Sequence, residues 1–348
     1  MTSRAIPAAV GAAVLFGVST PLAKQLVGHV DPWLLAGLLY VGSGVGLGIF
    51  ALLSRHRRAQ EAGITRAQVP WLGGAILAGG VIAPVLLAIG LTVVSGAVAS
   101  LLLNLEAVAT ALIAWCIARE HTNRRLVIGL IAILAGGLVL SVQGAGTSHV
   151  GTWWGPVLIM GACVAWGIDN ACTRPVSSAD PVLVAMWKGL VAGGVNTLIA
   201  LLSGAHLPAI GPLLMTLAVG LFGYGISLVL FVVALRHLGT GRTGAYFAVA
   251  PFIGALTAVL LGDSLTLPLV IAGFLMAIGV WLHLTESHGH LHQHEELDHD
   301  HAHEHDEHHQ HEHRADDPPG PIHRHTHRHA PHQHDHPHVP DIHHRHAH

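Results

Sequence analysis

Long runs of apolar residues, separated by short polar connections, follow one another from residue 5 to residue 284. Most of these runs are near the ~20 residues that an α-helix needs to cross the hydrocarbon core of a bilayer. They lack the apolar–polar alternation of a barrel strand, and backbone groups in lipid must be hydrogen-bonded within the segment, so we expect helices. The pattern predicts ten transmembrane helices, at 5–27, 33–53, 70–90, 95–118, 125–143, 152–173, 181–203, 211–235, 243–262 and 267–284.

A short pattern of residues occurs twice in these runs, about 150 residues apart. An aromatic–Gly–aliphatic triplet, a cation seven residues after the Gly and an Asp-Pro pair follow one another in the same order. The first copy is Phe16-Gly17-Val18, Lys24 and Asp31-Pro32, and the second is Trp166-Gly167-Ile168, Arg174 and Asp180-Pro181. Three further positions, 144 residues apart, pair Leu91 with Leu235, Ala107 with Pro251 and Gly129 with Gly273. A duplicated membrane unit is typical of a secondary transporter.

Basic residues lie in alternate connections, and this predicts the orientation of the chain. Lys and Arg lie between predicted helices two and three, four and five, six and seven, and eight and nine. The connections 91–94, 144–151, 204–210 and 263–266 contain none. Because basic connections stay in the cytoplasm, we predict a multi-pass protein of the plasma membrane with both termini cytoplasmic. Five helices is an odd number, so the second copy must enter the membrane inverted relative to the first.

The charges divide the chain into a membrane body and a polar tail. The whole chain is 51% apolar and 11% charged, with a net charge of −3, whereas a soluble domain has about 25% charged residues. Residues 1–284 hold thirteen Lys and Arg against seven acids, and residues 285–348 hold four against thirteen. We predict a first five-helix repeat at 1–150, a second at 151–284 and a tail at 285–348. The predicted fold class is an all-α integral membrane protein with ten helices in two inverted repeats and a disordered His-rich tail.

Three segments of the predicted helices carry a recognisable pattern. They are FGVSTPLAK at 16–24, LLLNLEAVATALIAW at 101–115 followed by Arg119-Glu120, and AVAPF at 248–252 followed by Gly262-Asp263. In these segments the chain resembles the EamA family of the drug/metabolite transporter superfamily. The resemblance covers most of residues 5–284 and implies two inverted five-helix repeats around a central cavity. It indicates little about the substrate, because members carry very different solutes. Many relatives have Pro after the Leu-Glu of helix four, where this chain has Ala107.

A few polar residues lie deep within the predicted helices. A charged side chain at the bilayer centre costs roughly 2.5–3.5 kcal/mol on insertion scales, so it usually faces a cavity or a partner. Glu106 lies in the middle of helix four, and Lys188 lies about two turns into helix seven. We predict that both line the central cavity and bind solute or exchange a proton; the alternative is a structural ion pair or a charge that extends to the interface. The other predicted substrate-binding residues are Asp169, Asn170, Asn104, Tyr224 and Tyr246.

Other residues of the helices suggest structural roles. Helix two contains two overlapping G-x-x-x-G pairs, a spacing that lets helices approach closely in lipid. We expect these glycines to serve tight packing rather than a sliding surface. Lys24 and Arg174 lie near helix ends and are predicted to anchor the chain at the interface. The four glycines are Gly42, Gly44, Gly46 and Gly48.

The sequence contains no motif of an enzyme or of a pump driven by ATP. Cys116, Cys163 and Cys172 lie in predicted helices without a C-x-x-C pair, so neither a disulfide framework nor a thiolate metal site is expected. A P-loop and an H-E-x-x-H motif are missing from the sequence, and no G-x-G-x-x-G leads from a predicted strand to a helix. We predict that the protein is not an enzyme and needs no cofactor to fold. The expected partners are the lipid bilayer, a small-molecule solute and divalent metal ions, without nucleic acid; a homodimer stays open.

The tail holds 24 of the 31 histidines, often at alternate positions. Alternate side chains of an extended chain point the same way, so neighbouring imidazoles can close on one ion. Imidazole with a few carboxylates suits divalent Zn, Ni, Co or Cu. The tail has almost no large apolar residues and should be disordered without metal; a pH-responsive polyelectrolyte is the alternative. The predicted metal ligands are His288, His290, His292, His294, His299, His301, His303, His305, His323, His325, His327 and His329.

Two functions stay open from the sequence, and a third is more remote. We favour a secondary-active exporter of a small metabolite, with a cytoplasmic tail that binds divalent metal as a regulator or buffer. The alternative is a permease for divalent Ni, Co or Zn, in which the tail collects or delivers the cargo. The body argues against the permease, because its helices lack His, Asp and Glu at ligand spacing. The third is a membrane metal sensor that transports nothing.

Overall fold

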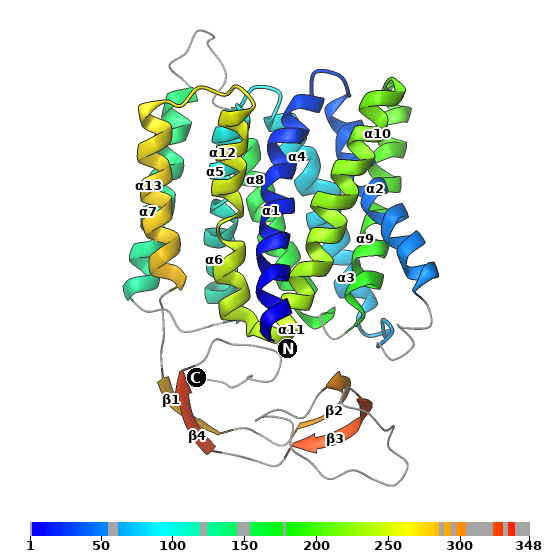
Figure 1. Ribbon diagram of the computed structural model, residues 1–348, viewed down its shortest axis with the longest axis vertical. Coiled ribbons are helices and arrows are strands. Elements are labelled where there is room, and N and C mark those ends of the chain that lie inside the picture. The colour runs from blue at the N-terminus through cyan, green and yellow to red at the C-terminus, as the bar shows by residue number, and fades with distance from the viewer. Residues whose placement is uncertain are drawn as a thin grey trace.

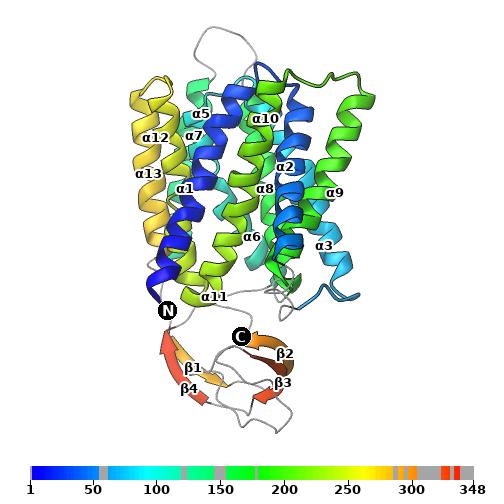
Figure 2. The same cartoon turned by 45° about the vertical axis from the view of Figure 1, so that its right-hand side comes forward.

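Long helices packed side by side make up the body of the protein, and four short strands lie beyond the end of the bundle where the N-terminus lies (Figures 1 and 2). This architecture comes from a computed structural model. It describes residues 2–54, 62–118, 124–144, 154–176, 179–284, 289–293, 297–303, 323–329 and 333–337.

The helices of the two sequence repeats follow one another in a similar order. Those of the first are α1 (Thr2–Leu26), α2 (Pro32–Leu53), α3 (Val69–Ala75), η1 (Ile76–Ile82), α4 (Ala83–Gly90), α5 (Gly96–Leu102), α6 (Leu105–Ala118) and α7 (Arg124–Gly144). Those of the second are α8 (Trp154–Thr173), η2 (Arg174–Val176), α9 (Pro181–Leu202), α10 (Ile210–Val219), η3 (Gly220–Ile226), α11 (Ser227–Phe247), α12 (Ala250–Leu260) and α13 (Leu267–Leu284).

Eight helical stretches among the described residues are long and apolar enough to cross a membrane. They agree within a few residues with the first eight predicted helices, except that the fourth stretch ends earlier, at Ile113. Two shorter apolar helices, Ala250–Leu260 and Leu267–Leu282, lie in the positions of the last two. Many large apolar side chains on these helices are exposed, as expected for a surface that faces lipid. The body is therefore that of a helical, multi-pass membrane protein.

Two predicted features of the helices are wrong. The predicted helix 95–118 is divided by a turn at residues 103–104, between α5 and α6. The connection predicted at 236–242 is helical, because α11 continues to Phe247. Residues 236–242 contain no proline to end a helix, and the break comes at residues 248–249, just before Pro251 at the start of α12.

The repeated Asp-Pro pairs are helix starts. Asp31 accepts hydrogen bonds from the backbone N–H groups of Trp33 and Leu34 at 3.0 and 3.1 Å. Asp180 accepts one from Val182 N at 2.9 Å. In both copies the following proline is the first residue of the helix, where its missing N–H is not needed. The clearest element of the sequence repeat therefore has a structural role in positioning α2 and α9.

Each repeat also contains one π-helical segment, at an equivalent position. The segments η1 and η3 are both seven residues long and begin at Ile76 and Gly220, which are separated by the same 144 residues as the sequence repeat. Each lies inside one membrane-spanning stretch, between α3 and α4 or between α10 and α11. Because π-helical turns are rare and often lie at functional sites, the residues around η1 and η3 are candidates for a functional site.

The equivalent helices α2 and α9 pack closely together through glycine (Figure 2). A Cβ on Gly44 would overlap the backbone of Gly189, and a Cβ on Gly193 would overlap the backbone of α2. Gly42 and Gly46 instead lie against α10 and η3. The two overlapping G-x-x-x-G pairs therefore pack against different neighbours, and this fits the tight packing expected for them.

Four segments of the tail form strands in two antiparallel pairs. β1 (Gly289–Gln293) pairs with β4 (Gln333–Pro337), and β2 (Leu297–His303) pairs with β3 (His323–His329). These segments differ from the disordered chain predicted from composition, and antiparallel pairing gives their backbone groups partners without a packed core. The expectation of disorder for the rest of the tail stays a prediction. Of the predicted metal ligands, His288, His294 and His305 lie outside the described residues.

Candidate functional site

A buried ion pair joins α8 to α9. Lys188 Nζ donates to Asp169 Oδ2, and the two side chains are only 13% and 6% exposed. Thr173 Oγ1 donates a hydrogen bond to the other oxygen of the carboxylate, Asp169 Oδ1, at 3.1 Å. The sequence predicted both charged residues as part of the site, and the structure brings them together.

Glu106 is held by an amide rather than by a cation. Asn170 Nδ2 lies 3.0 Å from Glu106 Oε1 and 3.2 Å from Thr110 Oγ1, so it bridges α8 and α6. Asn170 is exposed and Glu106 is partly exposed, which makes this side of the site accessible from outside the helix packing. Glu106 also lies close enough to Asp169 and Lys188 to interact with both electrostatically. We call Glu106, Asp169, Asn170 and Lys188 the polar cluster.

The polar cluster contains two carboxyl groups and one ammonium group. When both acids are ionised, its net charge is −1, since Lys188 compensates only one of them. An uncompensated charge is costly inside a membrane protein. A proton or a cationic group that reaches Glu106 would neutralise the cluster. The arrangement is therefore suited to bind a cation or to exchange a proton.

The π segment η1 lies against this cluster and is held by side chains from three helices. The Gly79 carbonyl oxygen accepts hydrogen bonds from Tyr40 OH at 2.7 Å and from Trp166 Nε1 at 3.1 Å. Asn196 Nδ2 lies 3.2 Å from Gly80 O and 3.3 Å from Val81 O. Asp169 lies so close to Gly79 that a Cβ there would overlap the carboxylate. The fold thus leaves backbone carbonyl groups of η1 to be satisfied by α2, α8 and α9.

Aromatic side chains connect this region to the second π segment. The ring of Tyr40 lies 5.5 Å, between centroids, from that of Tyr224 in η3. The ring centroid of Tyr224 lies 6.1 Å from that of Phe16 in α1, and the ring centroid of Phe16 lies 5.4 Å from that of Phe247. Tyr40 therefore touches both π segments, through its hydroxyl group in one case and its ring in the other.

Two of the predicted site residues lie elsewhere. Asn104 is in the turn between α5 and α6, where its amide donates to Leu101 O at 3.0 Å and lies 3.7 Å from Met276 Sδ of α13. Tyr246 packs in a small apolar cluster of α1 and α11. Of the predicted anchors, Lys24 donates to the carbonyl group of Leu91 at 2.6 Å and so ties α1 to the end of α4.

Tyr40, Trp166 and Gly79 were not predicted from the sequence as site residues. Tyr40 is one of two hydroxyl side chains, with Ser43, in the apolar run of α2, and a tyrosine in such a run is the signal that identified Tyr224. Trp166 appeared only as an element of the repeat, and Gly79 only as one glycine of an apolar helix. No sequence signal indicates that the carbonyl group of this glycine accepts two hydrogen bonds from side chains.

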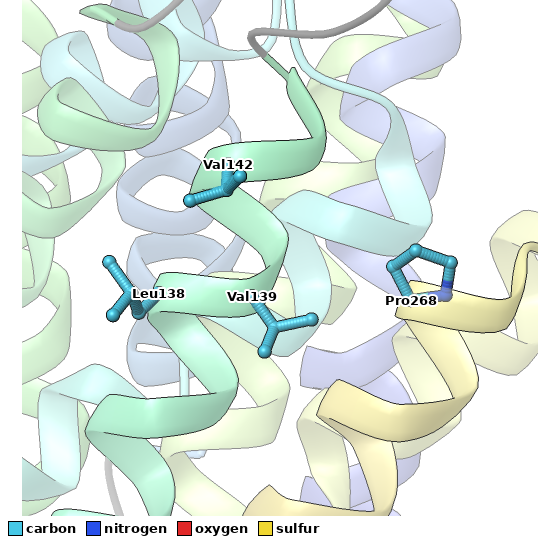
Figure 3. Close-up of a pocket in the computed structure, with 4 residues that line it drawn as sticks. All are labelled: Leu138, Val139, Val142 and Pro268. Atoms are coloured by element: carbon cyan, nitrogen blue, oxygen red, sulfur yellow. The ribbon is translucent and has the colours of Figure 1, made fainter.

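A pocket elsewhere on the body is entirely apolar. It is lined by Leu138, Val139 and Val142 of α7 and by Pro268 of α13 (Figure 3). Without a polar lining group it has nothing to orient a charged solute. In the part of the chain that the structure describes, no three His, Cys, Asp or Glu side chains are grouped to hold a metal ion.

The ion pair gives a prediction for stability. Replacing Lys188 by Met should destabilise the protein by about 3–5 kcal/mol, because it leaves the buried Asp169 charge without its partner. The double variant Asp169→Asn with Lys188→Met should lose much less, since no unpaired charge remains. Thermal unfolding in detergent would measure both. Equal destabilisation of the single and the double variant would show that the charge pairing is not what matters.

Comparison with known proteins identifies relatives for the membrane body. The sequence profile of the EamA-like transporter family matches residues 3–142 and 153–285. An uncharacterized transporter of Methanothermobacter thermautotrophicus is 28% identical over 287 residues, which are 78% of this chain and 83% of the relative. A solved crystal structure superposes with a TM-score of 0.59 and 22% identity, covering 80% of this chain and 95% of that one. At 22% sequence identity, the superposition shows only that the two proteins share a fold.

Proposed function

Because the chain belongs to the EamA-like transporter family, we propose that it is a secondary-active transporter that exports a small metabolite across the plasma membrane. The polar cluster carries this proposal. Four polar side chains from three membrane helices meet in a body that is otherwise mainly apolar, and buried charges of this kind mark solute or proton sites. In this proposal Glu106 binds the cationic group of the solute or a coupling proton. Lys188 offers an ammonium group to any anionic group of the solute.

The proposed transport cycle uses ten membrane crossings in two inverted repeats. The equivalent helix starts at Asp31 and Asp180 and the equivalent segments η1 and η3 support a repeat. The odd number of helices in each copy requires the inversion. Inverted repeats let one fold open alternately to either side of a site near the midplane.

Cysteine labelling in whole cells tests the proposed orientation. In a chain without its own cysteines, a membrane-impermeant maleimide should reach a His206→Cys variant from outside and should not reach an Arg57→Cys variant. The reason is that basic connections, such as the one that contains Arg57, remain cytoplasmic. Arg57 itself lies outside the described residues. Lysed cells, in which both positions react, give the control. The reverse pattern in intact cells would contradict the orientation.

A sensitivity screen tests the transport function itself. Cells that lack the protein would be exposed to panels of metabolites and of divalent metals, with the full chain and a tail-deleted chain as complements. A compound that becomes toxic only without the protein would then be measured as flux in proteoliposomes. Export predicts a higher cellular content of that compound in the deletion strain. A purified protein that moves none of the compounds found would contradict the proposal. The remaining alternative would then be a membrane metal sensor that transports nothing.

We also propose that the tail binds divalent Zn, Ni or Co at the predicted histidines. The opposed histidines of β2 and β3 support this, because His299, His301 and His303 lie in register with His327, His325 and His323. Opposite residues of antiparallel strands are close enough for two side chains to share one ion. If the cargo found by the screen is itself a divalent metal, the permease becomes the better description.

A further inference from the structure

The two π segments pack against residues that are equivalent in the two repeats. A Cβ on Gly79 of η1 would overlap the side chain of Asp169, and a Cβ on Gly223 of η3 would overlap that of Ser19. Gly79 and Gly223 are 144 residues apart, and Ser19 and Asp169 are 150 apart, as are Phe16 and Trp166. The helices agree with this, since α8 contacts η1 and α1 contacts η3.

These two equivalent contacts differ in charge. At the first, Asp169 is paired with Lys188 of α9. At the second, the equivalent residues are Ser19 and Leu39, so the contact is neutral. Leu39 lies with its backbone against Gly220 of η3. Among the side chains that the structure describes, the repeat therefore has an ion pair over η1 and a neutral contact at the equivalent position over η3.

We propose that η1 and η3 are equivalent hinges and that the Asp169–Lys188 ion pair holds only η1 closed against α8 and α9. A π-helical turn can change its hydrogen bonds more readily than a regular helix, and Gly79 and Gly80 add no side chain to hinder this. In one respect this proposal rests on the proposed function: the event that opens the hinge is the binding of solute or a proton at the polar cluster. Asn170, which contacts Glu106, is the neighbour of Asp169 in the chain. A charged group at Glu106 therefore competes for the same ion pair.

Tyr40 touches both hinges. Its hydroxyl group donates to Gly79 O in η1, and its ring contacts Tyr224 in η3. Opening of η1 breaks the hydrogen bond, whereas the ring contact does not depend on it, so η3 can stay closed when η1 opens.

Two buried positions report on the hinges separately. Ala192 of α9 is 0% exposed and packs against Gly80, whereas Ser43 of α2 is 3% exposed and packs against Gly225 of η3. These positions are equivalent in the two repeats, because they are 149 residues apart, the same separation as between Asp31 and Asp180. In a full-length chain with its three cysteines replaced, Ala192→Cys and Ser43→Cys variants would be reconstituted in liposomes. The measurement is the rate of modification by a small water-soluble thiosulfonate, without added solute.

The expected result is a selective change at the first hinge. Asp169→Asn with Lys188→Met should raise the modification rate at the Ala192→Cys position about tenfold, and should change the rate at the Ser43→Cys position by less than about twofold. Ser19→Ala, the matched change at the second hinge, should not alter the rate at the Ala192→Cys position. An unchanged rate at that position, or an equal rise at both positions, would overturn the proposal.

A second variant keeps the test decisive if the double variant does not fold. Gly79→Ala leaves both charges in place but takes the space that Asp169 occupies, so it should also raise the rate at the Ala192→Cys position. Gly73→Ala in α3 is its control, because nothing lies within 4 Å of a Cβ there. If Gly79→Ala and Gly73→Ala give the same rate, η1 is not held in this way. Since no solute is added, these results do not depend on transport; absent flux would contradict only the proposed function.

Discussion

Replacing Glu106 by Gln is expected to reduce solute flux about 10- to 100-fold, the effect of losing one charge-assisted hydrogen bond. Gln has nearly the same size and can accept the hydrogen bond that Asn170 donates at 3.0 Å. The change therefore removes the charge and little else. The cluster then contains one carboxyl and one ammonium group, so it no longer attracts a cation or a proton. Flux of the solute found in the screen, per amount of folded protein in proteoliposomes, is the measurement.

A matched carboxylate outside the cluster provides the control. Asp263 lies between α12 and α13, where its Oδ2 accepts a hydrogen bond from Ala97 N at 2.8 Å. Asp263→Asn makes the same chemical change and should keep most of the flux per folded protein. Normal flux in both Glu106→Gln and Lys188→Met would mean that neither charge takes part in transport. Equal losses in Glu106→Gln and Asp263→Asn would point to a general effect on the fold.

The features that the sequence predicted well are those set by local chemistry. Apolar runs of sufficient length identify membrane helices because lipid leaves the backbone few alternatives. Asp31-Pro32 and Asp180-Pro181 start helices because the carboxylate and the proline act on neighbouring residues. The charged residues of the polar cluster were proposed as site residues because a charge inside an apolar run is conspicuous in the sequence, and their role in a site stays a prediction.

What could not be predicted depends on how helices are rotated against one another. Lys188 pairs with Asp169 rather than with Glu106, a choice that depends on how α8 and α9 each pack against η1. Asn104 is near Glu106 in sequence, yet it lies in a turn and contacts α13. The hydrogen bonds of Tyr40 and Trp166 depend on a π segment whose glycines read in the sequence as part of an ordinary helix.

Removing the tail is expected to leave transport intact and to abolish the response to metal. A protein that ends at Glu286 keeps all the described helices of the body but loses every predicted metal ligand. The full chain should bind several Zn or Ni ions in calorimetry and show altered flux when either is added at constant pH. The truncated chain should do neither. A matched full-length control has the twelve predicted histidines replaced by Gln, which keeps the length and the acidic residues.

The pH dependence separates metal binding from its competitor. Metal binding needs neutral imidazole, so it should fade as the pH falls below about 6.5, the unperturbed value for histidine. A pH-responsive tail would instead alter flux over the same range without any metal, because protonated histidines reverse its negative charge. Flux measured with a chelator at pH 7.5 and at pH 5.5 distinguishes these cases. If the truncated chain responds to metal as the full chain does, the tail is not the metal-responsive element. If truncation abolishes flux of a metal that the full chain carries, the protein is a metal permease whose tail supplies the cargo.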